Sequence, residues 1–114
     1  MERWLDIIIT GAPSSGFEQV MDRLMLNYDA AQVYETGAPQ EGVNPLATAW
    51  AFKHSYPLVL GMPEDAVAML CRFHCAENKA VVVFNDGSAM HRERNDAAKL
   101  LALLSGAQYR EIAV

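Results

Sequence analysis

The chain has 114 residues, of which 52% are hydrophobic and 20% are charged, and its formal net charge is −5 at pH 7. This composition argues against a disordered segment and predicts one globular domain over residues 1–114. The acidic balance and the lack of a basic block argue against nucleic-acid binding, and the apolar runs are too short to cross a membrane.

The first residues do not resemble a signal peptide, because Glu2 and Asp6 stand where such a peptide has a basic start and a long apolar stretch. We therefore expect a cytoplasmic protein. In that reducing compartment the only two cysteines, Cys71 and Cys75, are expected to be free thiols.

The beginning of the sequence predicts a strand, a tight turn and a helix. Residues 5–10 are a β-branched run typical of a strand buried on both faces. Residues 11–16 then have the composition of a turn. Ser15 and Glu18 have the spacing of a capping box, which predicts a helix with apolar residues at helical spacing as far as Tyr28.

A second strand and helix follow, joined by a longer loop. Residues 31–36 predict the strand, supported by its Val and Tyr. The loop over 37–43 is longer than a simple connection requires, which is a sign of function. Asn44 as N-cap and Pro45 in the first helical position predict a helix that ends near residue 54.

The same alternation continues in the second half. Residues 56–61 predict a third strand, and the proline and acids of 63–65 predict the start of a helix that runs to about residue 77. Residues 79–84 are the second strong strand. Residues 85–94 are predicted to be a polar loop.

The chain is predicted to end with a helix from Asn95 or Asp96 through Leu104 and a strand over 108–114. This helix is apolar nearly all round, although a helix on one face of a small sheet usually keeps a polar outer side. We expect it either to be unusually buried or to join a partner, and we favour a homo-oligomer.

Strict alternation of strands and helices predicts an α/β fold, a single Rossmann-like domain whose five-stranded parallel sheet carries helices on both faces. In such sheets ligands bind beyond the carboxyl ends of the strands, where the strand order reverses. The functional surface is therefore expected in the loops after the first, second and fourth strands.

The candidate ligand-binding residues all lie in these three loops or at their ends. Their backbone amides are expected to bind phosphate, while Asp86 or Asn44 binds a ribose hydroxyl. Glycine and serine are also what tight turns require, so a purely structural role stays open. The candidates are Gly11, Ser14, Ser15, Gly37, Gly42, Asn44, Asp86, Gly87 and Ser88.

Two other kinds of chemistry are compatible with the residues of this sequence. Asp86 and Glu41 are the candidate carboxylates for an enzyme, although either residue also fits an ordinary solvated turn. Cys71, His74 and Cys75 share a helix face, as metal ligands do, but the same spacing fits a core face, and neither His54 nor His91 stands at a ligand spacing. We expect neither a metal nor a cofactor.

Three segments together resemble the SLOG superfamily of Rossmann-like domains, and in particular its YspA-type branch of unknown function. They are IIITGAPSSGFEQVMDRL, GAPQEGVNPLATAWAFKHSYPLVL and AVVVFNDGSA. The first turn of the family usually carries an Arg, where this chain has Pro13. The second motif carries Gly-Gly, an Arg and an Asp, where this chain has Ala38-Pro39, Glu41 and Asn44, and the Pro-Gly-Gly of the third is Asn85-Asp86-Gly87. The resemblance implies a nucleotide pocket with degenerate catalytic motifs.

The sequence thus predicts a domain that binds a nucleotide or a nucleotide-derived small molecule without turnover. One alternative is an N-glycosidic hydrolase or deoxyribosyltransferase that acts on nucleosides or nucleotides. The other is a protein-interaction module that acts through a self-associating apolar helix.

Overall fold

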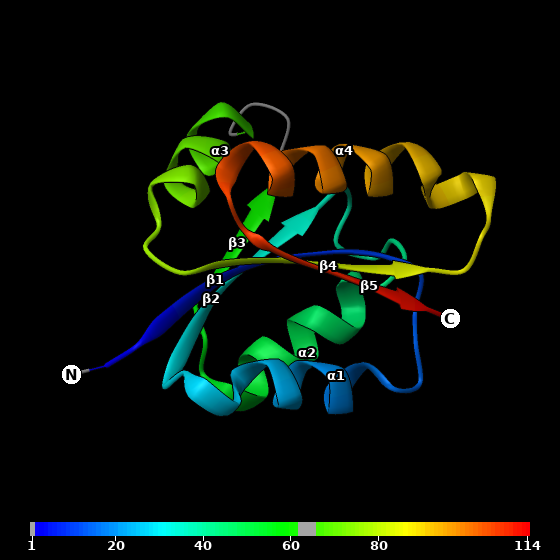
Figure 1. The fold of residues 1–114 in the computed structure, drawn as a ribbon. Helices are drawn as coiled ribbons and strands as arrows, with labels where there is room; N and C mark the ends of the chain where they lie inside the picture. The colour runs from blue at the N-terminus through cyan, green and yellow to red at the C-terminus, as the bar shows by residue number, and fades with distance from the viewer. Residues whose placement is uncertain (1, 62–65) are drawn as a thin grey trace.

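The computed structural model describes residues 2–61 and 66–114 (Figure 1). Strands and helices alternate along the chain, as the sequence predicts. The strands are β1 (Trp4–Gly11), β2 (Ala30–Thr36), β3 (Leu58–Gly61), β4 (Lys79–Asn85) and β5 (Gln108–Ala113), and the helices are α1 (Phe17–Leu24), the short 3₁₀ helix η1 (Met25–Asn27), α2 (Asn44–His54), α3 (Ala66–Cys75) and α4 (Ala89–Ser105).

The five strands form one parallel sheet in the order β3-β2-β1-β4-β5. This confirms the predicted α/β, Rossmann-like fold with a five-stranded parallel sheet. The chain moves outward in one direction from β1 to β3, crosses back to β4 on the other side of β1, and continues to β5. The strand order therefore reverses between β1 and β4, whose carboxyl ends lie side by side with Gly11 opposite Phe84.

Helices cover both faces of the sheet, with α1 and α2 on one face and α3 and α4 on the other (Figure 1). Successive residues of a strand point to opposite faces, so the β-branched runs of β1 and β4 supply both cores. Ile7 and Ile9 belong to the α1–α2 core, whereas Ile8 packs with Tyr34 and Phe73 on the α3–α4 face.

The predicted start of the last helix is wrong. Residues 89–94, predicted as part of a polar loop, form the first two turns of α4, which begins at Ala89 after Ser88 as its N-cap. The residues that α4 turns toward the sheet recur every three or four positions, and the first of them are polar. They are His91, Asn95, Ala98, Ala102 and Ser105. This polar beginning is what made the segment resemble a loop.

Both predicted side-chain caps are also wrong. Gly16, not Ser15, is the N-cap of α1, and no side chain caps that helix. Asn44 is the first residue of α2 and Val43 is its N-cap, although Pro45 does lie in the first turn as predicted. Helix α1 ends at Leu24, and η1 follows it where the sequence predicts a longer helix.

Helix α3 turns a different face to the sheet from the one that its cysteines and His74 predict. Phe73 is fully buried, whereas Leu70, Cys71, His74 and Cys75 are exposed. Both cysteines are free thiols. Among the described residues, no group of three or more His, Cys, Asp and Glu side chains is placed to hold a metal ion. The proposed helix start at 63–65 lies outside the described residues.

None of the helices in the described part of the chain is both long enough and apolar enough to span a bilayer.

Candidate ligand site at the carboxyl edge of the sheet

Gly11 ends β1 in a conformation that only glycine adopts easily, with φ of +110°. A Cβ atom at this position would lie 2.1 Å from the carbonyl oxygen of Phe84 on β4. The same carbonyl accepts a hydrogen bond of 2.8 Å from the backbone N–H of Ala12. Strands β1 and β4 thus stay in close contact to their last residues, and any space between them begins with the loops.

The β2–α2 loop folds across the end of β1. Gly42, with φ of +51°, packs its Cα atom against Gly11, so that an added Cβ would lie 2.1 Å from the Gly11 carbonyl oxygen. That oxygen accepts a hydrogen bond of 2.9 Å from the backbone N–H of Val43, whose side chain is fully buried. The loop therefore covers the end of β1 on the β2 side.

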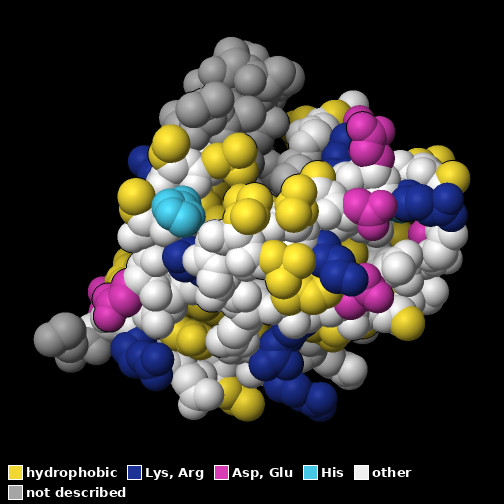
Figure 2. Space-filling model, turned by 45° about the horizontal axis from the view of Figure 1, so that its top comes forward, with side chains coloured by type: hydrophobic (Ala, Val, Ile, Leu, Met, Phe, Trp, Pro, Cys, Tyr) yellow, Lys and Arg dark blue, Asp and Glu magenta, His cyan; other side chains and the backbone are white. Residues whose placement is uncertain are grey.

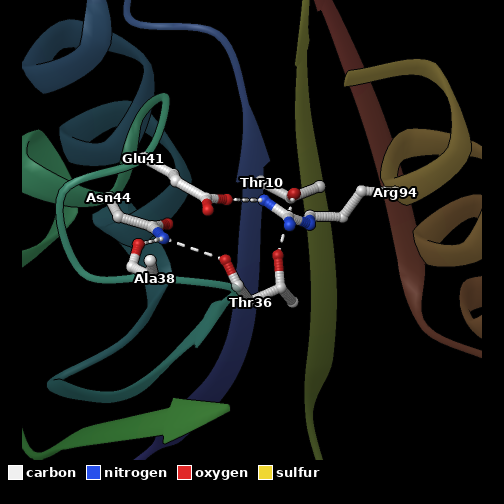
Figure 3. A network of polar contacts seen from close by, with 6 residues as sticks. All are labelled: Thr10, Thr36, Ala38, Glu41, Asn44 and Arg94. Atoms are coloured by element: carbon white, nitrogen blue, oxygen red, sulfur yellow. Dashed lines mark hydrogen bonds and ion pairs between the residues drawn. The ribbon is translucent and has the colours of Figure 1, made fainter. Parts of the chain in front are cut away.

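Asn44 fixes the other end of this loop (Figure 3). Its side chain is buried, and its Nδ2 donates to the carbonyl oxygens of Thr36, at 2.9 Å, and Ala38, at 2.8 Å. The hydroxyl of Thr36 lies 3.0 Å from the hydroxyl of Thr10 on β1. Because both amide hydrogens of Asn44 are already donated, the structure gives this predicted ligand residue a role in holding the loop.

Arg94 reaches from α4 to the same loop and pairs with Glu41 at 2.7 Å (Figure 3). Its guanidinium lies against Gly37, where a Cβ would come within 2.6 Å of it. The hydrogen bond and the positive charge of Arg94 hold the pKa of the Glu41 carboxyl below its usual value. Glu41, one of the two candidate catalytic carboxylates, thus already has a cationic partner.

The β1–α1 loop leaves the sheet at β1, beside β4 at the strand reversal. The hydroxyl of Ser14 accepts a hydrogen bond of 3.2 Å from the backbone N–H of Gly16, while Ser15 is exposed. Since Gly16 is the N-cap, α1 starts without a side-chain oxygen on its first N–H groups.

The β4–α4 loop is held by its own side chains. Asn85 accepts from the backbone N–H of Gly87 at 2.8 Å, and Asp86 accepts from that of Ser88 at 2.9 Å. The hydrogen bond from the backbone N–H of Ser88 is the main cause that lowers the pKa of the Asp86 carboxyl. Asp86 is exposed and forms part of the turn.

His91, in the first turn of α4, lies near both neighbouring loops. Its side chain is only 8% exposed, and its Cε1 atom is 3.1 Å from where a Cβ on Gly42 would be. Its charge contributes to lowering the pKa of both Glu41 and Asp86, although it is a minor cause for each. Within the described residues no side chain or backbone group hydrogen-bonds to its ring.

The structure therefore separates the predicted ligand residues into two groups. Gly11, Gly37, Gly42 and Asn44 are packed or hydrogen-bonded into the closed β1–β2 side of the edge. Gly87 and Ser88 instead line a polar pocket of about 260 Å³ between α4 and β5. Ser14, Ser15 and Asp86 belong to neither group: the two serines lie in the turn just before α1, and Asp86 is exposed in the β4–α4 turn.

Three polar residues at this edge were not among the predicted ligand residues: His91, Arg94 and Asn95. His91 and Arg94 were missed because residues 85–94 were predicted to be a loop, and the direction in which a side chain points cannot be predicted for a loop. Their helical spacing is the signal that would have found them, since residues three and four apart share a helix face.

A buried carboxylate, Glu35 on β2, was also not predicted. It is 1% exposed and accepts a hydrogen bond from the hydroxyl of Thr48, while its second oxygen, Oε1, has no partner among the described residues. Burial raises the pKa of this carboxyl, and the bond from Thr48 offsets only part of the rise.

Comparison with known proteins finds no matching family model, no matching curated protein and no matching solved structure. The fold and the carboxyl edge define a Rossmann-like domain on their own, and the resemblance to the SLOG superfamily stays a prediction.

Proposed function

We propose that this domain binds a nucleotide or a nucleotide-derived small molecule at the carboxyl edge of its sheet, with the phosphate near the start of α1. The observation that carries the proposal is the pair of uncapped helices, α1 and α4, that begin on either side of the strand reversal.

Uncapped helix starts favour an anionic ligand. The first N–H groups of a helix have no partner within the helix, and the helix dipole makes this end attractive to phosphate. Helix α2 differs, because its first three residues offer no free N–H: Asn44 donates to the carbonyl of Glu41 at 2.9 Å, Pro45 has no N–H, and Leu46 donates to the carbonyl of Val43 at 3.0 Å. In α1 the first N–H, that of Phe17, likewise donates to the carbonyl of Ser14 at 3.2 Å, but the next two residues, Glu18 and Gln19, have no such partner among the described residues. Of these three helices, α1 and α4 therefore keep N–H groups in their first turns that are free to face a ligand.

His91 is a second observation that supports a ligand at this edge. Its side chain is only 8% exposed and has no hydrogen-bond partner among the described residues, yet neither ring nitrogen is fully buried, so both are available to a ligand. Its position at the start of α4 suits contact with a phosphate or hydroxyl group.

The proposal is tested by placing a negative charge at the N-cap of α1. The nearest atom to an added Cβ at Gly16 is the Ser14 hydroxyl at 3.9 Å, so Gly16→Asp fits without strain. An Asp cap also strengthens the helix slightly. We expect the variant to fold at least as well as the wild type and to lose affinity for phosphate-bearing ligands by roughly tenfold or more, which equals about 1.4 kcal/mol.

Thermal unfolding with inorganic phosphate and nucleoside mono-, di- and triphosphates provides the measurement. A ligand at a hundred times its dissociation constant adds about 2.7 kcal/mol of stability, which moves the midpoint by roughly 10 °C in a domain of this size. Gly16→Asn, of the same shape but uncharged, is the matched control and is expected to retain more affinity than Gly16→Asp. No shift with any of these compounds, or equal affinity in Gly16→Asp and wild type, would contradict the proposal.

Self-association through α4 is a second function, favoured by the leucines on its outer face. Leu100, Leu103 and Leu104 are 56%, 73% and 72% exposed. Figure 2 shows hydrophobic side chains gathered over the α3–α4 side of the molecule. Beside them lies an apolar pocket of about 290 Å³ whose lining includes Leu70, Leu101 and Leu104.

A protruding leucine next to an apolar pocket on one face is what a twofold interface between identical chains requires, since each copy then supplies both parts. We therefore propose a second copy of this chain as the occupant of the pocket.

Light scattering of the wild type and Leu103→Glu tests this second proposal. We expect a dimer that Leu103→Glu converts to a monomer, while Leu26→Glu, at a site 78% exposed on the far side of the sheet, leaves the dimer intact. A monomeric wild type at all accessible concentrations would rule the interface out.

A further inference from the structure

A polar pocket lies between α4 and β5, and residues of the β4–α4 loop, α4 and β5 line it. Its volume is about 260 Å³, and the α4 side chains that line it share one helix face. Glu111 closes it from β5, on the strand face that also carries Tyr109. The lining residues are Asn85, Gly87, Ser88, Arg92, Asn95, Asp96 and Glu111.

Asn95 lines the pocket from α4, and a purely structural role does not explain its side chain. Its side chain is 7% exposed, and its Oδ1 atom is buried without a hydrogen-bond partner among the described residues. The hydroxyl of Ser88, in the same pocket, is also buried and unpaired. Leaving a buried polar atom unpaired destabilises a protein, so two such atoms in one pocket point to a ligand that completes their hydrogen bonds.

The charges around the pocket restrict what this ligand is. Arg92 disfavours an ammonium group, and the carboxylates of Asp96 and Glu111 disfavour a phosphate or another carboxylate. A neutral ligand whose groups both donate and accept hydrogen bonds can pair with the cation and with both carboxylates of the pocket. Hydroxyl groups have this property: they can donate to Asn95 Oδ1 and to the carboxylates, and accept from Arg92.

Glu111 is positioned to accept a hydrogen bond from a ligand hydroxyl. The hydroxyl of Tyr109 donates to its Oε1 at 2.9 Å, which holds the carboxylate in place and leaves its second oxygen for another donor. Burial, followed by this bond, raises the pKa of Tyr109 to about 12, so the hydroxyl remains a donor at neutral pH.

We infer that this pocket binds the vicinal diol of a sugar, as found in the ribose of a nucleoside. The inference rests on the proposed function for the class of the whole ligand, whereas the pocket itself rests on Asn95, Ser88 and their charged neighbours. It places the sugar on the β5 side of the β4–α4 loop.

The test compares uncharged nucleosides that differ in their sugar. We expect adenosine, guanosine, cytidine and uridine to raise the midpoint of thermal unfolding, and their 2′,3′-dideoxy counterparts to give no shift. Isothermal titration then measures the affinity for the nucleoside that gives the largest shift. Equal shifts with ribosides and dideoxyribosides would overturn the inference.

Asn95→Leu keeps the approximate volume of the side chain and removes the unpaired oxygen. We expect this variant to melt at a higher temperature than the wild type without ligand, and to lose at least tenfold in nucleoside affinity. Ser88→Ala is expected to weaken binding by a smaller factor. Ser105→Ala is the matched control, because Ser105 has an unpaired buried hydroxyl on the same helix but does not line the pocket.

The two proposals fail in distinguishable ways. If phosphate compounds bind and Gly16→Asp weakens them while no nucleoside binds, the sugar pocket is wrong and the proposed function stands. If nucleosides bind and Asn95→Leu abolishes their binding while Gly16→Asp changes nothing, the sugar pocket stands and the assigned phosphate contact is wrong. Unchanged nucleoside affinity in Asn95→Leu overturns the inference in either case.

Discussion

The substitution Gly42→Ala is expected to be among the most damaging single changes in this domain. Gly42 has φ of +51°, and a Cβ atom there would lie 2.1 Å from the carbonyl oxygen of Gly11 and 3.1 Å from Cε1 of His91. The first of these atoms belongs to the backbone at the end of a buried strand and cannot move aside cheaply. The methyl group therefore has to displace the β2–α2 loop.

Three costs add up in this variant. A left-handed backbone costs an L-residue about 1–2 kcal/mol, and forcing a methyl group into a packed site costs about 1–3 kcal/mol. Displacing the loop also weakens the bond between Val43 N–H and the Gly11 carbonyl, worth about 0.5–1.5 kcal/mol. The total of about 2.5–6.5 kcal/mol lowers the midpoint of thermal unfolding by roughly 10–26 °C, at roughly 4 °C per kcal/mol.

Gly87→Ala isolates the first of these costs. Gly87 has φ of +79°, yet nothing lies within 4 Å of an added Cβ. This variant is expected to lose only about 1–2 kcal/mol. Thermal and urea unfolding of both variants provide the assay. If Gly42→Ala proved no more harmful than Gly87→Ala, the close contact between the loop and the end of β1 would be wrong.

Two further predictions concern buried polar side chains. Glu35→Gln is expected to raise stability at pH 7 by about 1–3 kcal/mol, because it removes a buried carboxylate with an unpaired oxygen. Since burial raises the folded-state pKa of Glu35 above 4.5, protonation removes the charge as pH falls, so the stability advantage of the variant should disappear below about pH 4.5. Unfolding curves from pH 4 to 8 measure the difference in stability between variant and wild type. A difference that does not change with pH would contradict this reasoning. Tyr34→Phe is expected to cost about 1.5–3 kcal/mol, because the Tyr34 hydroxyl donates to the Asp6 carboxylate at 2.5 Å. Urea unfolding checks it against Tyr28→Phe, and equal small losses in both variants would show that the bond to Asp6 contributes little.

The sheet could be predicted because its signals are local and strong. The β-branched runs at 5–10 and 79–84 are β1 and β4, the two neighbouring strands at the reversal of strand order. Strict alternation with helices then leaves a parallel sheet as the arrangement that short connections allow. The carboxyl edge, and with it the region of the candidate site, follows from the same pattern.

The start of α4 could not be predicted in this way, because its first turns bury polar side chains. Hydrophobic periodicity locates a helix by the apolar residues that it turns inward. At His91 and Asn95 those inward positions are polar, so the pattern begins only at Ala98. The failure of the pattern thus marks the two side chains that the candidate site depends on.

The helix starts were mispredicted for a related reason. Ser15 and Asn44 both have the side chains of ordinary caps, but in the folded chain other contacts decide their roles. Asn44 donates to two loop carbonyls, at Thr36 and Ala38, which lie six and eight residues before it. A choice between such partners depends on where the loop lies in three dimensions, which spacing along the chain does not reveal.

These observations together divide the carboxyl edge into a closed half and an open half. On the β2 side the contact of Gly42 with Gly11 and the ion pair of Arg94 with Glu41 occupy the space over β1. On the β5 side a polar pocket remains, lined by Asn95, whose Oδ1 atom is unpaired among the described residues. Under the proposed function, a ligand that reaches across the reversal from the start of α1 would extend toward β5, because the protein's own loop occupies the β2 side. The anionic end of the ligand would then contact the N–H groups of α1, and its hydroxyl groups would enter the pocket between α4 and β5. This order along the edge follows because the β2–α2 loop leaves only the β5 side open.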